Sequence, residues 1–142
     1  MTGLEYMIAI RDGMHPPAPI QDLIGFRLVE VNEGRTAFSL VPDGRMLNPI
    51  GTVHGGIAGL LLDSCMGAAV HTTCAAGEGY STLETSFNLV RAIMPDTGEI
   101  VAAGRVLYRG GRVATAEGAV RRVSDDKLVA HGTSTCLIIA TG

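Results

Sequence analysis

Large aromatic side chains are rare in this chain. The 142 residues include no tryptophan, three tyrosines and three phenylalanines. Most of a core must therefore be built from smaller side chains, and the nineteen glycines indicate many tight turns and close backbone contacts. Charge is sparse as well: 18% of the residues are charged and 46% are hydrophobic, a balance typical of a globular chain. The length fits one domain with a core of its own.

Basic runs and long apolar runs are also missing. The net charge of −3 comes from 14 acidic and 11 basic residues, so nucleic acid is not an expected partner. The longest apolar stretch, residues 57–76, is interrupted by Asp63 and His71 and makes a poor membrane span. The first residues lack the basic start and unbroken apolar segment of a signal peptide. We expect no membrane partner and a cytoplasmic location.

The cysteines and histidines predict no metal site. Cys65, Cys74 and Cys136 are an odd number set in apolar stretches, which is typical of buried free thiols in a reducing compartment. The four histidines are scattered and no C-x-x-C spacing occurs. We expect neither a metal nor a separate cofactor.

Residues 48–66 contain the most informative pattern. After Gly56 they predict a helix that is apolar nearly all round, and such a helix belongs in an interior. Asp63 lies in the middle of it. A buried carboxylate needs hydrogen-bond donors, a counter-charge or water. Asp63 therefore either joins packed elements or takes part in chemistry.

Glycines share the helix face of Asp63: Gly56, Gly59 and Gly67. Such a stripe indicates close approach by a second backbone or by a ligand. His54 precedes Asp63 by nine residues, which is about 13.5 Å along a helix axis and half a turn around it. The two could cooperate only if a second copy of the helix runs antiparallel to the first, an approach that the glycine stripe would permit.

The remaining periodicity predicts one helix wrapped by a sheet. A short amphipathic helix over 3–11 and a helical turn over 21–24 come first, and the central helix is expected to fade around 75–79. Strands are expected at 26–32, 35–41, 80–94, 99–108, 112–123 and 127–139. A lone apolar helix among antiparallel strands is buried only if the sheet curls around it.

We therefore predict an α+β fold, with one highly curved antiparallel sheet of five to six strands around a long central helix. Residues 1–24 would form an N-terminal helical segment and residues 25–142 the main domain. The exposed edge of such a sheet favours pairing with a second copy.

The order of elements carries a resemblance. The H-G-G before the central helix, the acid nine residues after that histidine, and the strand S-T-L-E-T-S-F-N-L-V-R-A are similar to those of the hotdog-fold acyl-CoA thioesterases of the phenylacetic-acid-degradation (PaaI-like) type. The similarity covers residues 25–140. It implies hydrolysis of an acyl-CoA thioester, a homodimer whose two subunits share each active site, and a homotetramer.

The resemblance also implies roles for single residues. Its catalytic acid falls on Asp63, and the backbone N–H that polarises the thioester carbonyl falls on Gly55. An upstream amide that holds carbonyl or water falls on Asn48, and a hydroxyl near the acid falls on Thr82, with Ser81 beside it. The acid and the H-G-G turn come from different subunits in this family, in agreement with the distance argument.

The chemistry of these residues suits thioester hydrolysis. Free N–H groups at a helix N-terminus, such as those at Gly55 and Gly56, can stabilise a developing oxyanion. Asp63 would act as general base or, through an anhydride, as nucleophile. We expect His54 to shape the turn by bonding to backbone, since no carboxylate lies at a spacing that would orient it.

Several residues are predicted to contact the substrate, and each of them also has an ordinary structural interpretation. The acyl pocket would be lined by Ile57, Leu61, Met66 and Phe87, which could equally be plain core. The CoA phosphates would meet Arg91, Arg109 and Arg112, which could equally be solvated surface residues. Two other functions stay open: a hotdog hydratase or dehydratase using His54 with Asp63, and a non-catalytic acyl-CoA binding protein.

Overall fold

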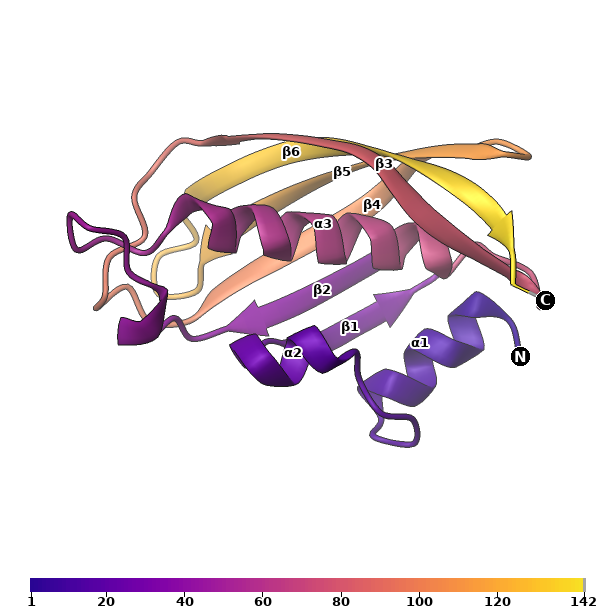
Figure 1. Cartoon of the computed structure of the whole chain (residues 1–142), viewed down its shortest axis with the longest axis horizontal. Helices are drawn as coiled ribbons and strands as arrows, with labels where there is room; N and C mark the ends of the chain where they lie inside the picture. Colours follow the sequence, from indigo (N-terminus) through magenta and orange to yellow (C-terminus); the bar gives the residue numbers. More distant parts are fainter. Residues whose placement is uncertain (142) are drawn as a thin grey trace.

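One antiparallel sheet curls around one long helix (Figure 1). The structure is a computed structural model, and it describes residues 1–141. Its helices are α1 (Gly3–Arg11), α2 (Pro19–Ile24) and α3 (Gly55–His71), with a 3-10 turn over Gly44–Met46. The strands are β1 (Arg27–Asn32), β2 (Arg35–Leu40), β3 (Glu78–Leu89), β4 (Ile100–Arg109), β5 (Val113–Arg122) and β6 (Leu128–Ala140). The six strands lie in the order β1-β2-β4-β5-β6-β3, which confirms the predicted curved sheet around a central helix.

The backbone of helix α3 lies very close to the backbone of the inner face of the sheet. A Cβ added at Gly104 of β4 would come 2.6 Å from the carbonyl of Cys65. The hydroxyl of Thr36 on β2 donates to the same carbonyl oxygen at 2.7 Å. Glycine at position 104 therefore allows the sheet to curve closely around the helix.

The N-terminal segment covers one side of this assembly. Helix α1 is capped reciprocally by Thr2 and Glu5, each accepting the other's backbone N–H through its side chain. It has the predicted bounds, and it packs on β1 and α3. Helix α2 starts at Pro19, two residues before the predicted turn, because proline suits the first helical position. It ends at Gly25, whose φ of 93° requires glycine.

Strand β3 is shorter than predicted. It ends at Leu89 instead of continuing to residue 94, close to the point where its partner strand β6 begins. The N–H groups of Val90 and Arg91 both donate to the Val129 carbonyl of β6, at 2.8 and 3.2 Å, so the regular ladder stops there. The Ile93 carbonyl then accepts from the N–H of Val53 at 2.8 Å and supports the loop that leads into α3.

Helix α3 also ends earlier than predicted. It stops at His71 and does not extend towards residue 79. The hydroxyls of Thr72 and Thr73 donate back to the carbonyls of Ala69 and Val70, both at 2.6 Å. These bonds satisfy carbonyls of the last turn, which the helix itself leaves without donors.

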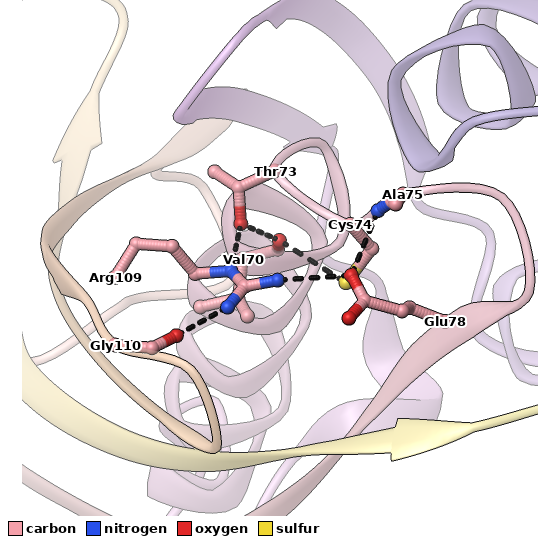
Figure 2. A network of polar contacts seen from close by, with 7 residues as sticks. All are labelled: Val70, Thr73, Cys74, Ala75, Glu78, Arg109 and Gly110. Carbon is pink, nitrogen blue, oxygen red and sulfur yellow. Dashed lines mark hydrogen bonds and ion pairs between the residues drawn. The ribbon is translucent and has the colours of Figure 1, made fainter.

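A polar network fixes this end of α3 (Figure 2). The Arg109 guanidinium donates to Thr73 Oγ1 at 3.0 Å, pairs with Glu78 Oε1 at 3.0 Å and bonds to the Gly110 carbonyl. The same oxygen of Glu78 accepts from the N–H of Ala75 at 2.9 Å. One arginine thereby joins the end of α3, the start of β3 and the end of β4.

We expect Arg109→Gln to lower the free energy of unfolding by about 1–2 kcal/mol, since charge-assisted bonds at a half-buried site are lost. The matched control is Arg105→Gln, which removes a more exposed pair with Glu117. The side chains of that pair are 53% and 41% exposed, against 24% and 35% for Arg109 and Glu78. The control should lose less than about 1 kcal/mol. Urea unfolding measures both, and equal losses would contradict the assignment.

The three cysteines are free and buried, as predicted. Burial raises the pKa of the Cys65 thiol to about 12, so this thiol is protonated and unreactive at neutral pH. Among the helices in the described part of the chain, none has the length and apolarity needed to cross a membrane.

Candidate active site

Asp63 projects from the middle of α3 towards β3. Its Oδ1 accepts hydrogen bonds from Thr82 Oγ1 at 2.9 Å and from Thr85 Oγ1 at 3.3 Å. Its Oδ2 accepts none from residues 1–141, and the carboxylate is half-buried rather than enclosed. Two hydroxyls thus hold one oxygen of the carboxylate in place while the other stays accessible. The predicted neighbour Thr82 is where the sequence placed it, and Thr85 is a second hydroxyl that the sequence reasoning missed.

Aromatic rings from β3 fill the glycine stripe around Asp63. A Cβ at Gly59 would lie 2.8 Å from the Phe87 ring, and one at Gly67 would lie 2.5 Å from the Tyr80 ring. The idea that this stripe admits the helix of a second copy is therefore wrong: a strand of the same chain occupies it. The glycines instead let β3 lie close enough for its threonines to reach Asp63.

The turn before α3 leaves one N–H without a partner. His54 is the N-cap of α3, and its Nδ1 accepts from the N–H of Gly56 at 2.9 Å, which confirms that His54 bonds to backbone. The Gly56 N–H is therefore occupied and does not serve the substrate as predicted. The N–H of Gly55 has no partner within residues 1–141. At the positive end of α3 it is suited to stabilise an oxyanion.

A backbone hydrogen bond joins the two ends of the loop that precedes this turn. His54 N–H donates to the Met46 carbonyl at 2.7 Å. Asn48 organises the middle: its Oδ1 accepts from the N–H groups of Ile50 and Thr52, both at 3.1 Å, and its Nδ2 donates to Thr52 Oγ1 at 2.7 Å. Asn48 therefore shapes the loop, and three of its four side-chain bonding positions are used for this.

Gly55 and Asp63 lie far apart within one chain. They are eight positions apart on α3, which is about 12 Å along the helix axis. A thioester carbonyl cannot contact both groups of the same chain, so the two halves of the predicted site remain separate in a single copy.

A cleft of about 380 Å³ adjoins Asp63, between α3 and the N-terminal helices. On α3 it is lined by Leu60, Ser64 and Ala68, whose spacing of four places them in one stripe beside Asp63. The predicted lining residues Leu61 and Met66 are wrong, because both are fully buried against the sheet. Ile57 and Phe87 lie outside the lining as well.

An uncharged aromatic cluster forms one end of the cleft. The His71 ring lies 5.2 Å from the Tyr6 ring and 5.6 Å from the Tyr80 ring, measured between centroids. Burial lowers the pKa of His71. Burial and, secondarily, the charge of Asp63 raise the pKa of Tyr80 to about 12. Both side chains are therefore mainly neutral at pH 7.

Comparison with known proteins decides the family. The sequence pattern of the Thioesterase superfamily matches residues 50–129, which include α3, Asp63 and β3. The chain belongs to this superfamily. No curated protein matches the sequence.

Solved structures agree with this family at the level of the fold. A phenylacetic acid degradation-related protein of Ralstonia eutropha is 28% identical, with a TM-score of 0.83, covering 93% of this chain and 98% of its own. The PaaI protein of Escherichia coli is 16% identical, with a TM-score of 0.84 and coverage of 98% and 97%. A Streptococcus mutans protein solved with acetyl-CoA is 23% identical, with a TM-score of 0.73 and coverage of 81% and 89%. The predicted hotdog thioesterase of the PaaI-like type is confirmed.

Three arginines of this thioesterase are predicted to bind the phosphates of CoA, and they differ in how free their guanidinium groups are to do so. Arg109 is committed to the network at the end of α3, which argues against a role in phosphate binding. Arg91 is exposed and donates to the Leu128 carbonyl at 2.6 Å. Arg112 and the predicted contact residue Ser81 are both exposed. The roles of these three stay predictions.

Proposed function

We propose that this thioesterase hydrolyses an acyl-CoA thioester to the free acid and CoA. The observation that carries the proposal is the Asp63 carboxylate, with one oxygen held by two hydroxyls and the other accessible beside an apolar cleft. The acetyl-CoA bound to the Streptococcus mutans neighbour supports CoA as the thiol part of the substrate. CoA belongs to the substrate, and no further cofactor takes part.

In the proposed reaction Asp63 acts as general base. It takes a proton from a water molecule whose oxygen bonds to the carbonyl carbon of the thioester. Negative charge collects on the carbonyl oxygen, which accepts the N–H of Gly55 at the end of a helix. The carbon–sulfur bond then breaks, and the CoA thiolate leaves and takes up the proton. Acid and CoA are the products, so atoms and charge balance.

The proposed site needs a second copy of the chain. Gly55 and Asp63 of one chain are too far apart, so the N–H must come from another copy. The edge strand β3 offers a surface for this pairing, because it bonds to β6 on one side and to no strand of residues 1–141 on the other. It exposes apolar side chains, with Leu83 60% and Phe87 38% exposed, and such edges favour further pairing. A homotetramer remains a prediction.

The hydratase alternative is less well supported. A neutral imidazole that accepts a hydrogen bond at Nδ1 carries its proton at Nε2. His54 accepts the Gly56 N–H at Nδ1, so its Nε2 is a donor and cannot take a proton from substrate. A non-catalytic binding protein would bind acyl-CoA without releasing thiol.

Release of free thiol from short, long and aromatic acyl-CoAs tests the proposal, and a mixing experiment tests the shared site. Asp63→Asn and Gly55→Pro should each be nearly inactive alone. After equal amounts are unfolded and refolded together, about a quarter of wild-type activity should return, because half of the symmetric dimers are mixed and each has one intact site. Each variant refolded alone is the control. No recovery, when the mixed dimer is demonstrably formed, would overturn the proposal that Asp63 of one copy works with Gly55 of another.

A further inference from the structure

The N-terminal helices roof the cleft beside Asp63. Tyr6 and Ile10 of α1 and Ile20 of α2 face Leu60 and Ser64 of α3 across it. We infer that this cleft takes the acyl group of the substrate, and that Ile10 and Ile20 limit the length of that group. This inference rests on the proposed function, since it places the acyl chain next to the water that Asp63 activates.

The position of the cleft follows from the topology. Strands β1 and β3 are the two edges of the curled sheet, so the groove over α3 opens between them. Helices α1 and α2 precede β1 and lie on its side of the opening, while Tyr80 comes from β3 on the other side. The catalytic carboxylate lies on α3 between these two sides. Residues of the N-terminal segment can therefore change the depth of the cleft without touching Asp63.

The lining defines the class of acyl group. It is mostly apolar and aromatic, and within the described residues it includes no lysine or arginine. Asp63 supplies its one carboxylate. An acyl group with a carboxylate of its own would meet Asp63 without a compensating cation, and like charges in a poorly solvated site repel strongly. We therefore expect an uncharged, apolar acyl group.

The size of the cleft sets a limit on that group. A dry cavity of roughly 150 Å³ binds benzene, and this cleft measures about 380 Å³. It can hold an aromatic ring with a short linker, or an aliphatic chain of medium length. A long fatty chain would exceed this volume, and Ile20 of α2 is one of the residues that line the cleft.

The test uses matched substitutions on α2. Ile20 and Leu23 are both exposed, at 40% and 69%, but of the two Ile20 alone lines the cleft. Ile20→Trp should lower kcat/KM for the longest accepted acyl-CoA by about tenfold or more, the scale of one to several methylenes in an apolar pocket. The kcat/KM for acetyl-CoA should change by less than about twofold, because a two-carbon group fills only a small part of a cleft of about 380 Å³. Leu23→Trp should leave both values unchanged.

A second pair of substitutions, on α1, tests the effect of a larger cleft. Ile10→Ala enlarges the cleft and should shift the preferred acyl group to a longer one, while Ile8→Ala, on the same helix outside the lining, should not. Malonyl-CoA and succinyl-CoA complete the panel and should be poor substrates. If either is preferred over an uncharged acyl group of equal length, the assigned class is wrong.

Binding of non-hydrolysable thioether analogues of the same lengths separates the two hypotheses. Turnover with an unaltered length preference in Ile20→Trp and Ile10→Ala overturns the inference and leaves the proposed function standing. Length-dependent binding that Ile20→Trp abolishes, without thiol release by the wild type, supports the cleft and overturns the hydrolysis. Absence of both binding and release overturns both.

Discussion

Asp63→Asn is expected to lower kcat for acyl-CoA hydrolysis by about 10²–10⁴-fold, the usual contribution of a general base. The substitution keeps the shape of the side chain, and the amide oxygen can still accept from Thr82 and Thr85 as Oδ1 does now. What disappears is the basic oxygen that would take the proton from water. KM should change little, because the acyl group and CoA contact other residues. Thiol release under saturating substrate measures the effect.

Glu33→Gln is the matched control for this loss. It removes an exposed carboxylate from the turn between β1 and β2, at the opposite edge of the sheet from β3, and kcat should stay within about twofold of the wild type because surface charges at a distance act weakly. Thermal unfolding should show both variants folded. If Asp63→Asn retains most of its kcat, the carboxylate is a packing element, and the hydroxyls of β3 merely satisfy it.

The fold could be predicted largely because burial leaves few choices for one apolar helix among six strands. The alternation of the strands and the glycine turns identified the elements within a few residues. The predicted ends of β3 and α3 were wrong for different reasons. The regular ladder of β3 stops where its partner strand β6 begins, and the pattern of β3 itself does not contain that information. At the end of α3, Thr72 and Thr73 bond back to carbonyls three residues earlier, a local bonding pattern that apolar periodicity does not take into account.

The catalytic candidates were easier to locate than the substrate pocket. Asp63 was conspicuous because a carboxylate on an apolar helix needs an explanation, and His54 because it begins that helix. Leu61 and Met66 were assigned to the pocket on hydrophobicity alone, which does not distinguish a side chain facing the sheet from one facing a cleft. The spacing of four shared by Leu60, Ser64 and Ala68 was the available signal. Its meaning depended on α1 and α2 covering that stripe, which no local pattern specifies.

Gly55→Pro isolates the other half of the proposed site. Proline removes the N–H of Gly55, and kcat should fall by about 10²–10³-fold, the cost of losing one oxyanion donor. The helix should tolerate the change, because proline suits the first helical position and this N–H makes no hydrogen bond within residues 1–141. His54 has φ −56° and ψ 131°, an extended conformation of the kind that a following proline requires.

Gly55→Ala distinguishes the missing N–H from the added side chain. A Cβ at this position would lie 3.6 Å from Leu89 Cδ2, an ordinary contact, and the N–H is kept. The alanine variant should therefore lose far less activity than the proline variant, within about tenfold of the wild type, since the oxyanion donor remains in place. Comparable kcat losses in two equally stable variants would show that bulk near the turn, and not the N–H, is what the reaction cannot tolerate. A loss confined to proline would identify the N–H of Gly55 as the group that stabilises the carbonyl oxygen.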